Sequence, residues 1–173
     1  ASKLINFFFT TDQIAPMSQN RHLKLQKPLD NLSLASAPTT RDNISFSGDK
    51  VTRRILLAFE GQLLLQPVLA NLHNQIVSPQ HYRGSYEENS SVFSYIRYRR
   101  PGSYKPLSFV DVKEGRFPKG SFANKIVIIG RDTLLNNADY VYTPFSRDPF
   151  AMSRLDAHGH IIDTLISYDG LRK

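Results

Sequence analysis

The stretch KIVIIG, from Lys125 to Gly130, is the strongest indication of the fold of this chain. Its four apolar residues, Ile126 to Ile129, are all β-branched and leave no polar alternation, which is typical of a short strand covered on both faces. Gly130 follows at once, where a strand-to-helix turn often needs positive φ or a close approach of the backbone. In open α/β sheets, ligands bind at this carboxyl edge. We therefore predict a central strand here, with a ligand site at its end.

Other elements are expected on both sides of this strand. Apolar or alternating runs predict strands at residues 4–9, 43–48, 51–59 and 92–98. Turn residues at 47–49 would join the second and third of these runs into a hairpin. Apolar residues three and four positions apart over 65–76 and 155–166 predict two amphipathic helices, whereas the polar segment 78–91 is interpreted as a surface excursion. The fold class that follows is α/β, a single domain with a central mixed sheet covered by helices.

The composition narrows the class of protein. A chain of 173 residues fits one domain, residues 1–173, and the lack of cysteine excludes thiol chemistry, cysteine-ligated zinc and disulfides. Its 22 Lys and Arg against 15 Asp and Glu give a formal charge of +7, which favours anionic surroundings. No apolar run is long enough to span a membrane. Because an apolar strand is expected at the very start, we expect the chain to be part of a longer parent, truncated at its N-terminus.

Four motifs follow one another in an order known from a protein family. They are YIRYRRPGSYKPLSFVDV at 95–112, KIVIIG at 125–130, DYVYTPF at 139–145 and DAHGHIIDTLI at 156–166. With these motifs the chain resembles the type-two CHASE domain, an extracytoplasmic sensory module of bacterial cyclases, histidine kinases and serine/threonine kinases. VTRR at 51–54, with the leucine-rich helix after it, resembles the family more loosely. Arg154, Gly159 and His160 differ from the residues usual in the family.

The resemblance implies an input domain without catalysis or cofactor, on the periplasmic side of the inner membrane. It also implies flanking transmembrane helices and an output domain, a cyclase or a kinase, all outside this chain. The signal would be a small molecule or a protein that the sequence does not identify, and a homodimer is plausible for signalling of this kind. The motif residues that carry over in a structural role are Asp111, Lys125, Pro144, Phe145 and Asp163.

The expected ligand site combines the end of the KIVIIG stretch with the loop and helix after it. The candidate ligand-binding residues are Gly130, Arg131, Asp139, Thr143 and His158. Asp139 could lend its carboxylate to a ligand, with Lys125 and Arg131 as nearby counter-charges, or it could bond the amides of its own turn. A single glycine after a strand is a weak phosphate signal, because it lacks the successive amides of a glycine-rich loop.

The last helix also invites a metal interpretation. Asp156, His158, His160 and Asp163 offer imidazole and carboxylate ligands within eight residues. Residues two apart diverge on a helix, however, and polar residues that open a helix more often cap it or bond neighbouring loops. We therefore expect no metal.

The main alternative function is a basic, aromatic-rich binding surface. Between residues 82 and 105, tyrosines are interleaved with arginines, a pattern typical of proteins that stack bases and neutralise phosphates. No RNP-like signature accompanies it, so nucleic acid is the less favoured partner, and these residues can instead face anionic lipid headgroups. The chain has neither a nucleophile elbow nor a metalloprotease motif, and no catalytic residue is assigned.

Overall fold

The structure, a computed structural model, describes residues 10–11, 40–41, 49–74, 78–100, 102–130, 140–146 and 151–167. Its strands are β1 (Thr10–Thr11), β2 (Thr40–Arg41), β3 (Arg54–Phe59), β4 (Gln62–Leu63), β5 (Ser85–Glu88), β6 (Ser91–Tyr95), β7 (Tyr140–Val141) and β8 (Met152–Ser153). Its helices are α2 (Leu65–Asn74), α3 (Phe109–Lys113), α4 (Arg154–Ile166) and the short 3-10 helix η1 (Pro79–His81). In this part of the chain, no helix has the length and apolar character needed to cross a bilayer.

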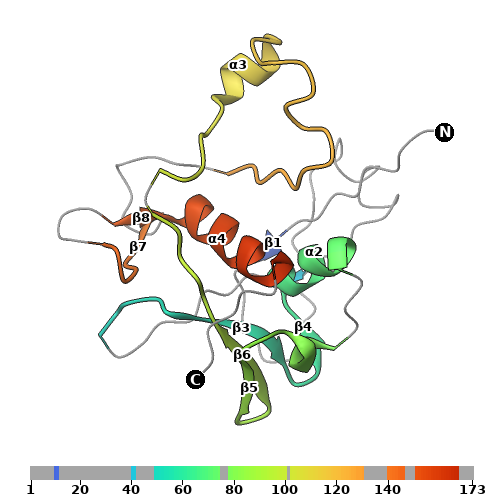
Figure 1. Cartoon of the computed structure of the whole chain (residues 1–173), viewed down its shortest axis with the longest axis vertical. Coiled ribbons are helices and arrows are strands. Elements are labelled where there is room, and N and C mark those ends of the chain that lie inside the picture. The colour runs from blue at the N-terminus through green and yellow to red at the C-terminus, as the bar shows by residue number, and fades with distance from the viewer. Residues whose placement is uncertain are drawn as a thin grey trace.

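The largest sheet has the strand order β4-β3-β6-β5, and its neighbouring strands are all antiparallel (Figure 1). β3 lies inside it because Ile55–Ala58 is a continuous apolar run, and these residues are buried. β5 and β6 form a hairpin whose two turn residues, Asn89 and Ser90, both have positive φ, the geometry that suits the twist of the strands. Parallel pairing occurs between β1 and β2. The predicted class, a single α/β domain, is confirmed.

Both predicted helices are present and pack against each other. α2 accommodates Pro67 because this residue lies in the first turn, where the missing N–H has no partner to lose. α4 follows directly on β8, and the hydroxyl of its N-cap, Ser153, accepts a hydrogen bond from the Asp156 N–H at 3.3 Å. Asp156 in the first turn also complements the helix dipole.

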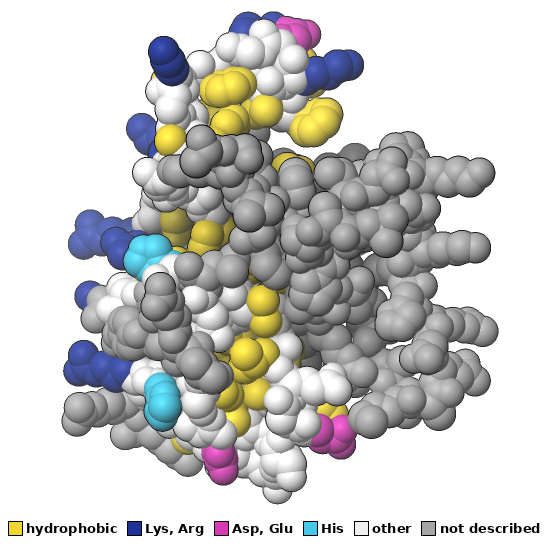
Figure 2. Space-filling model, turned by 90° about the vertical axis from the view of Figure 1, so that its right-hand side faces the viewer, with side chains coloured by type: hydrophobic (Ala, Val, Ile, Leu, Met, Phe, Trp, Pro, Cys, Tyr) yellow, Lys and Arg dark blue, Asp and Glu magenta, His cyan; other side chains and the backbone are white. Residues whose placement is uncertain are grey.

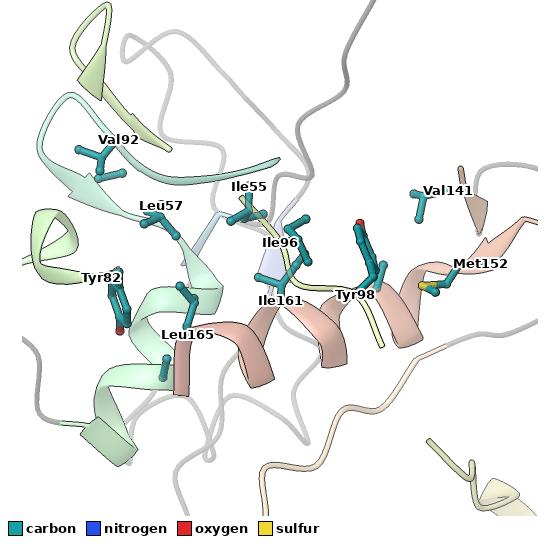
Figure 3. Close-up of a cluster of buried hydrophobic side chains, with 13 residues drawn as sticks. Ile55, Leu57, Tyr82, Val92, Ile96, Tyr98, Val141, Met152, Ile161 and Leu165 are labelled. Atoms are coloured by element: carbon teal, nitrogen blue, oxygen red, sulfur yellow. The ribbon is translucent and has the colours of Figure 1, made fainter. Parts of the chain in front are cut away.

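The core lies between α4 and the sheet. Figure 3 shows Ile161 and Leu165, one turn apart on α4, pointing toward the sheet residues Ile55 and Leu57 and toward Ile96, which follows β6. All five side chains are buried. Apolar contacts with the sheet therefore hold α4 in place. A change in the position of α4 would also disturb its packing against the sheet.

The prediction that KIVIIG forms the central strand is wrong. Residues 125–130 have no regular secondary structure, Val127 is 50% exposed and Ile129 is 80% exposed. A β-branched run becomes a strand only where neighbouring strands satisfy its backbone, and among the described residues the interior positions of the large sheet belong to β3 and β6. The same rule about uninterrupted apolar runs does hold for β3.

Gly130 meets one of the two expectations for it. Its φ is not positive, but a Cβ at this position would lie 2.6 Å from Cδ2 of Leu155 on α4. The backbone therefore approaches the first turn of α4 closely, and only glycine fits there unless Leu155 moves.

Residues 102–130, which we call the α3 segment, rise away from the sheet on the other side of α4 and carry α3 at their tip (Figure 1). Figure 2 shows hydrophobic side chains gathered at this end of the molecule, with Lys and Arg side chains around them. The exposed large apolar residues of the segment are Leu107, Phe109, Val110, Phe122, Ile126, Val127 and Ile129. Its acidic residues Asp111 and Glu114 both pair with Arg116.

Two further expectations differ from the structure or fall outside it. The segment 78–91, interpreted as a surface excursion, contains η1 and β5. β5 is polar at three of its four positions, and its aromatic residue Tyr86 stacks on Phe93 and Tyr95 of β6, with ring centroids 5.8 and 5.6 Å apart. The predicted strands at 4–9 and 43–48 lie outside the described residues, and with 43–48 so does the first half of the predicted hairpin.

Candidate functional site: an arginine pocket beside the last helix

A cavity of about 420 Å³ lies where the chain after β6 passes the C-terminal half of α4. Residues 97–100 form one wall, and Phe145 forms another. The helix side is formed by Asp163 and Thr164 of α4 and by Ser167 at its C-cap. We call this cavity the arginine pocket, after Arg97, Arg99 and Arg100. Its volume lies within the range of small-molecule sites, roughly 300–1,000 Å³.

Two side chains of α4 hold the arginine-bearing wall in place. The Arg97 N–H donates to Oγ1 of Thr164 at 3.1 Å, and the Arg99 N–H donates to Nδ1 of His160 at 3.3 Å. His160 and Thr164 are one helical turn apart, so their spacing of roughly 6 Å matches two residues of extended chain. Tyr98, between the two arginines, is buried, whereas Arg97 and Arg99 are exposed. All three residues line the pocket.

Arg99 of the pocket wall forms an ion pair with Asp163 of α4. Nε of Arg99 lies 2.6 Å from Oδ2 of Asp163, and the two side chains are 56% and 34% exposed. Ion pairs this exposed typically stabilise a fold by at most about 1 kcal/mol. Among the described residues, Arg100 has no carboxylate partner. Of the described residues that line the pocket, three are arginines and one, Asp163, is acidic.

Behind the wall, His160 is enclosed by aromatic rings. The centroid of its ring lies 5.6 Å from that of Tyr98 and 4.9 Å from that of Tyr104. Burial lowers the pKa of His160; the nearby Asp163 opposes this change and Arg99 adds to it. Burial, with a smaller contribution from Asp163, raises the pKa of Tyr104 to about 12. His160 is therefore a neutral acceptor for the Arg99 amide, and Tyr104 stays protonated near neutral pH.

Protonation of His160 should make the fold less stable in acid. Its pKa is below 6.5 in the folded protein, so the unfolded chain binds the proton more readily, and the stabilisation present above about pH 6.5 is lost as the pH falls through the folded pKa. Urea midpoints measured at about pH 7.5 and about pH 5.5 should therefore differ less in His160→Gln, which keeps an acceptor, than in the wild type. His81→Gln, at an exposed histidine of η1, is the control. An unchanged pH difference in His160→Gln would contradict this prediction.

Gly159 is explained by the ring of Tyr104. A Cβ on Gly159 would lie 3.0 Å from Cε2 and 3.2 Å from Cζ of that ring. Alanine is favoured over glycine inside a helix by about 1 kcal/mol, and we expect this gain to appear in full only once the ring is removed. Urea unfolding should show that Gly159→Ala is more stabilising in a Tyr104→Ala background than in the wild type. Equal effects in the two backgrounds would show that the ring does not restrict this position.

His158 lies on the opposite side of α4 from the pocket. Its Nδ1 is 3.0 Å from Nε2 of Gln66, and both side chains are buried between α2 and α4. An amide nitrogen can only donate, so this contact requires an unprotonated Nδ1. His158 and His160 thus face different elements, as expected for helix residues two apart. Among the described residues, no group of three potential metal ligands comes together.

The three predicted ligand residues that the structure describes, Gly130, Thr143 and His158, have different neighbours. Gly130 packs on Leu155, and Thr143 is buried, with its N–H bonded to the Ser146 hydroxyl at 2.9 Å. His158 faces α2. Arg131 and Asp139 lie outside the described residues.

Of the motif residues that carried over in a structural role, Phe145 and Asp163 line the arginine pocket. Pro144 adjoins Phe145 in the same turn, and Lys125 is exposed in the α3 segment. Asp111 bonds Arg116 at 2.7 Å. Phe145 and Asp163 thus contribute to the pocket, although the sequence did not mark them as ligand-binding.

The three arginines were missed as a site. Sequence reasoning treated Arg97, Arg99 and Arg100 as motif residues or as tips of a nucleic-acid surface. The sequence feature that could have indicated this site is the combination of Arg97 and Arg99, two residues apart after a strand, with Asp163 on a later helix. The base-stacking alternative loses support, because Tyr82 and Tyr98 are buried and Tyr86 stacks on β6.

Comparison with known proteins agrees with the resemblance read from the motifs. The family model of the CHASE2 domain matches residues 4–173. Neither a curated protein nor a solved structure gives a significant match. CHASE2 domains are extracellular sensory domains of membrane signalling proteins. Since the match covers nearly the whole sequence, this chain belongs to the CHASE2 domain family.

Proposed function

We propose that this domain is the periplasmic input part of a bacterial transmembrane signalling protein, and that it receives its signal in the arginine pocket. The observation that supports this most directly is that one side of the pocket is formed by Asp163 and Thr164 of α4, a helix that is also packed against α2 and the sheet. A ligand in the pocket contacts a helix that is part of the core. The output is a cyclase or kinase domain in the parent protein.

For the pocket to signal, the ligand must bind two arrangements of the domain with different affinities. The links between residues 97–100 and α4 provide such a difference. They include the hydrogen bonds of the Arg97 and Arg99 N–H groups to Thr164 and His160, and the ion pair of Arg99 with Asp163. A ligand that changes any of these alters how firmly α4 is held. The change then reaches the output domain through the connection that follows α4.

The location of the domain can be tested by chemical labelling of the parent protein in intact cells. The chain contains no cysteine, so Lys119→Cys introduces one thiol into it, at an exposed position of the α3 segment. A maleimide that cannot cross the inner membrane should label this variant in intact cells, after subtraction of any labelling of the unsubstituted parent. Labelling that occurs only after the inner membrane is permeabilised would show that the domain is cytoplasmic and that the proposal is wrong.

A further inference from the structure

We propose that the arginine pocket binds a small organic oxyanion, a carboxylate or a phosphate ester, which takes the place of Asp163 on the guanidinium of Arg99. Binding itself stands on the geometry of the pocket alone. Its role as the signal rests on the function proposed above.

The first argument is charge. Three arginine residues line the cavity, and Asp163 is its one acidic lining residue among the described part of the chain. Guanidinium groups hold carboxylates and phosphates through parallel N–H donors and lose less water than an ammonium group when they do so. Arg100, exposed and without a carboxylate partner in the described residues, is placed to contribute a second guanidinium to the same anion.

The second argument is shape. A cavity of about 420 Å³ is larger than a bare phosphate or sulfate ion requires and fits a molecule with several carbon atoms. The ring of Phe145, half exposed, gives it an apolar wall, whereas Thr164 and Ser167 bring hydroxyl-bearing side chains on the helix side. The ligand that fits has an oxyanion at one end and an apolar or aromatic part at the other.

The third argument is that the ion pair of Arg99 can be exchanged. The Nε atom of Arg99 is 2.6 Å from the Asp163 carboxylate, yet both side chains are accessible to solvent, so the pair stabilises the fold little. An incoming oxyanion that contacts Arg99 and Arg100 together replaces one such contact with more than one. The hydrogen bonds from the Arg97 and Arg99 amides to α4 remain, so the exchange loosens the side-chain link without unfolding the wall.

The first test is calorimetric titration of the full chain with phenyl phosphate and benzoate, with benzylamine as a cationic probe of similar shape. The two anions should bind and benzylamine should not. Arg99→Ala and Arg100→Ala should each weaken anion binding at least tenfold. Arg54→Ala is the matched control, because Arg54 pairs with Glu88 at 3.2 Å on the large sheet, away from the pocket, and it should bind like the wild type. Equal loss in the control, or no binding of either anion, would overturn the inference.

The second test concerns the exchange with Asp163. Asp163→Asn removes the carboxylate that pairs with Arg99 and should raise the affinity for phenyl phosphate several-fold, whereas Glu88→Gln, which removes one negative charge elsewhere, should leave it unchanged. Weaker binding in Asp163→Asn, or equal gains in both variants, would refute displacement. Because Arg100→Ala alters an exposed side chain, it retains a folded protein for comparison even if Arg99→Ala does not fold.

A third experiment distinguishes an oxyanion carried by a lipid headgroup from a soluble one. Sedimentation with phosphatidylglycerol vesicles that is lost in Arg99→Ala and competed by phenyl phosphate identifies a lipid headgroup as the ligand. Calorimetric binding of the free anions without vesicle binding identifies a soluble one, and both results support the inference. If no anion binds, the labelling result for the parent protein still stands. The labelling experiment tests the location of the domain and the titration tests the class of ligand, so each proposal can fail without the other.

Discussion

Ile161→Ala is expected to lower the free energy of unfolding by about 2–5 kcal/mol, the range typical of a buried isoleucine truncated to alanine. The side chain is 0% exposed and lies between α4 and the sheet, near Ile96 and Ile55 (Figure 3). The loss combines the lost burial with the cavity that remains. For a domain of this size, 1 kcal/mol corresponds to roughly 2–4 °C in the melting temperature, so the change is easily measured by urea or thermal unfolding.

The matched control is Ile129→Ala, the same substitution in the α3 segment. Ile129 is 80% exposed, and its truncation should change stability by no more than about 0.5 kcal/mol. The two variants distinguish the exposed Ile129 of the structure from the buried Ile129 of a central strand, which the KIVIIG stretch predicted. Comparable losses in the two variants would show that residues 126–129 are buried in solution and that the description of the α3 segment is wrong.

The second large effect is expected at the contact of Gln66 with His158, which joins α2 to α4. Replacing either residue alone with leucine leaves a buried polar group without its partner and should cost about 1–3 kcal/mol. The double variant should cost clearly less than the sum, because the contact between the two side chains is lost only once.

A double-mutant cycle in urea measures this coupling directly. Gln80→Leu is a control for the loss of a glutamine, since Gln80 is exposed and bonds Glu87 on the surface at 2.9 Å. Strictly additive losses for Gln66→Leu and His158→Leu would mean that the two side chains do not interact.

Periodicity was sufficient to find the elements whose burial is continuous along the chain. The apolar spacing of 155–166 located α4 to within a residue at its start, and the alternation from Val92 located β6. The buried face of α2 was less well predicted: the spacing favoured Leu65, Val68 and Leu69, whereas the structure buries Gln66 and Ala70 along with Leu65. Gln66 contacts the buried His158, and a polar residue gives no hydrophobic signal for a buried position.

The strand expectation failed for a related reason. Four β-branched residues indicate a tendency to extend and to be covered, but they do not say which segments supply the cover or the backbone partners. β3 and β6 can pair because each has another strand of suitable register beside it. β5 was missed because its stability depends on the rings of Tyr86, Phe93 and Tyr95, a cross-strand interaction that a single run of residues does not reveal.

The pocket could be predicted only in part, because it joins segments more than sixty residues apart. Arg99 and Asp163 are separated by 64 positions, and Phe145 lies between them in the sequence. The family motif brought attention to Phe145 and Asp163 without indicating that they share a cavity with Arg99. Their meeting depends on how Thr164 and His160 hold the backbone of residues 97–99, a relation between two elements that alternation and helical spacing describe separately.

The apolar side chains of the α3 segment have a practical consequence for work with the isolated domain. Ammonium sulfate and phosphate buffers strengthen the association of uncovered apolar groups, so salting-out should drive chains together through Phe109 and Ile129. Sulfate is itself an oxyanion, so it would also compete with the ligand proposed for the arginine pocket. Chloride buffers with a mild detergent should keep preparations monodisperse and leave the ligand site accessible to titrants.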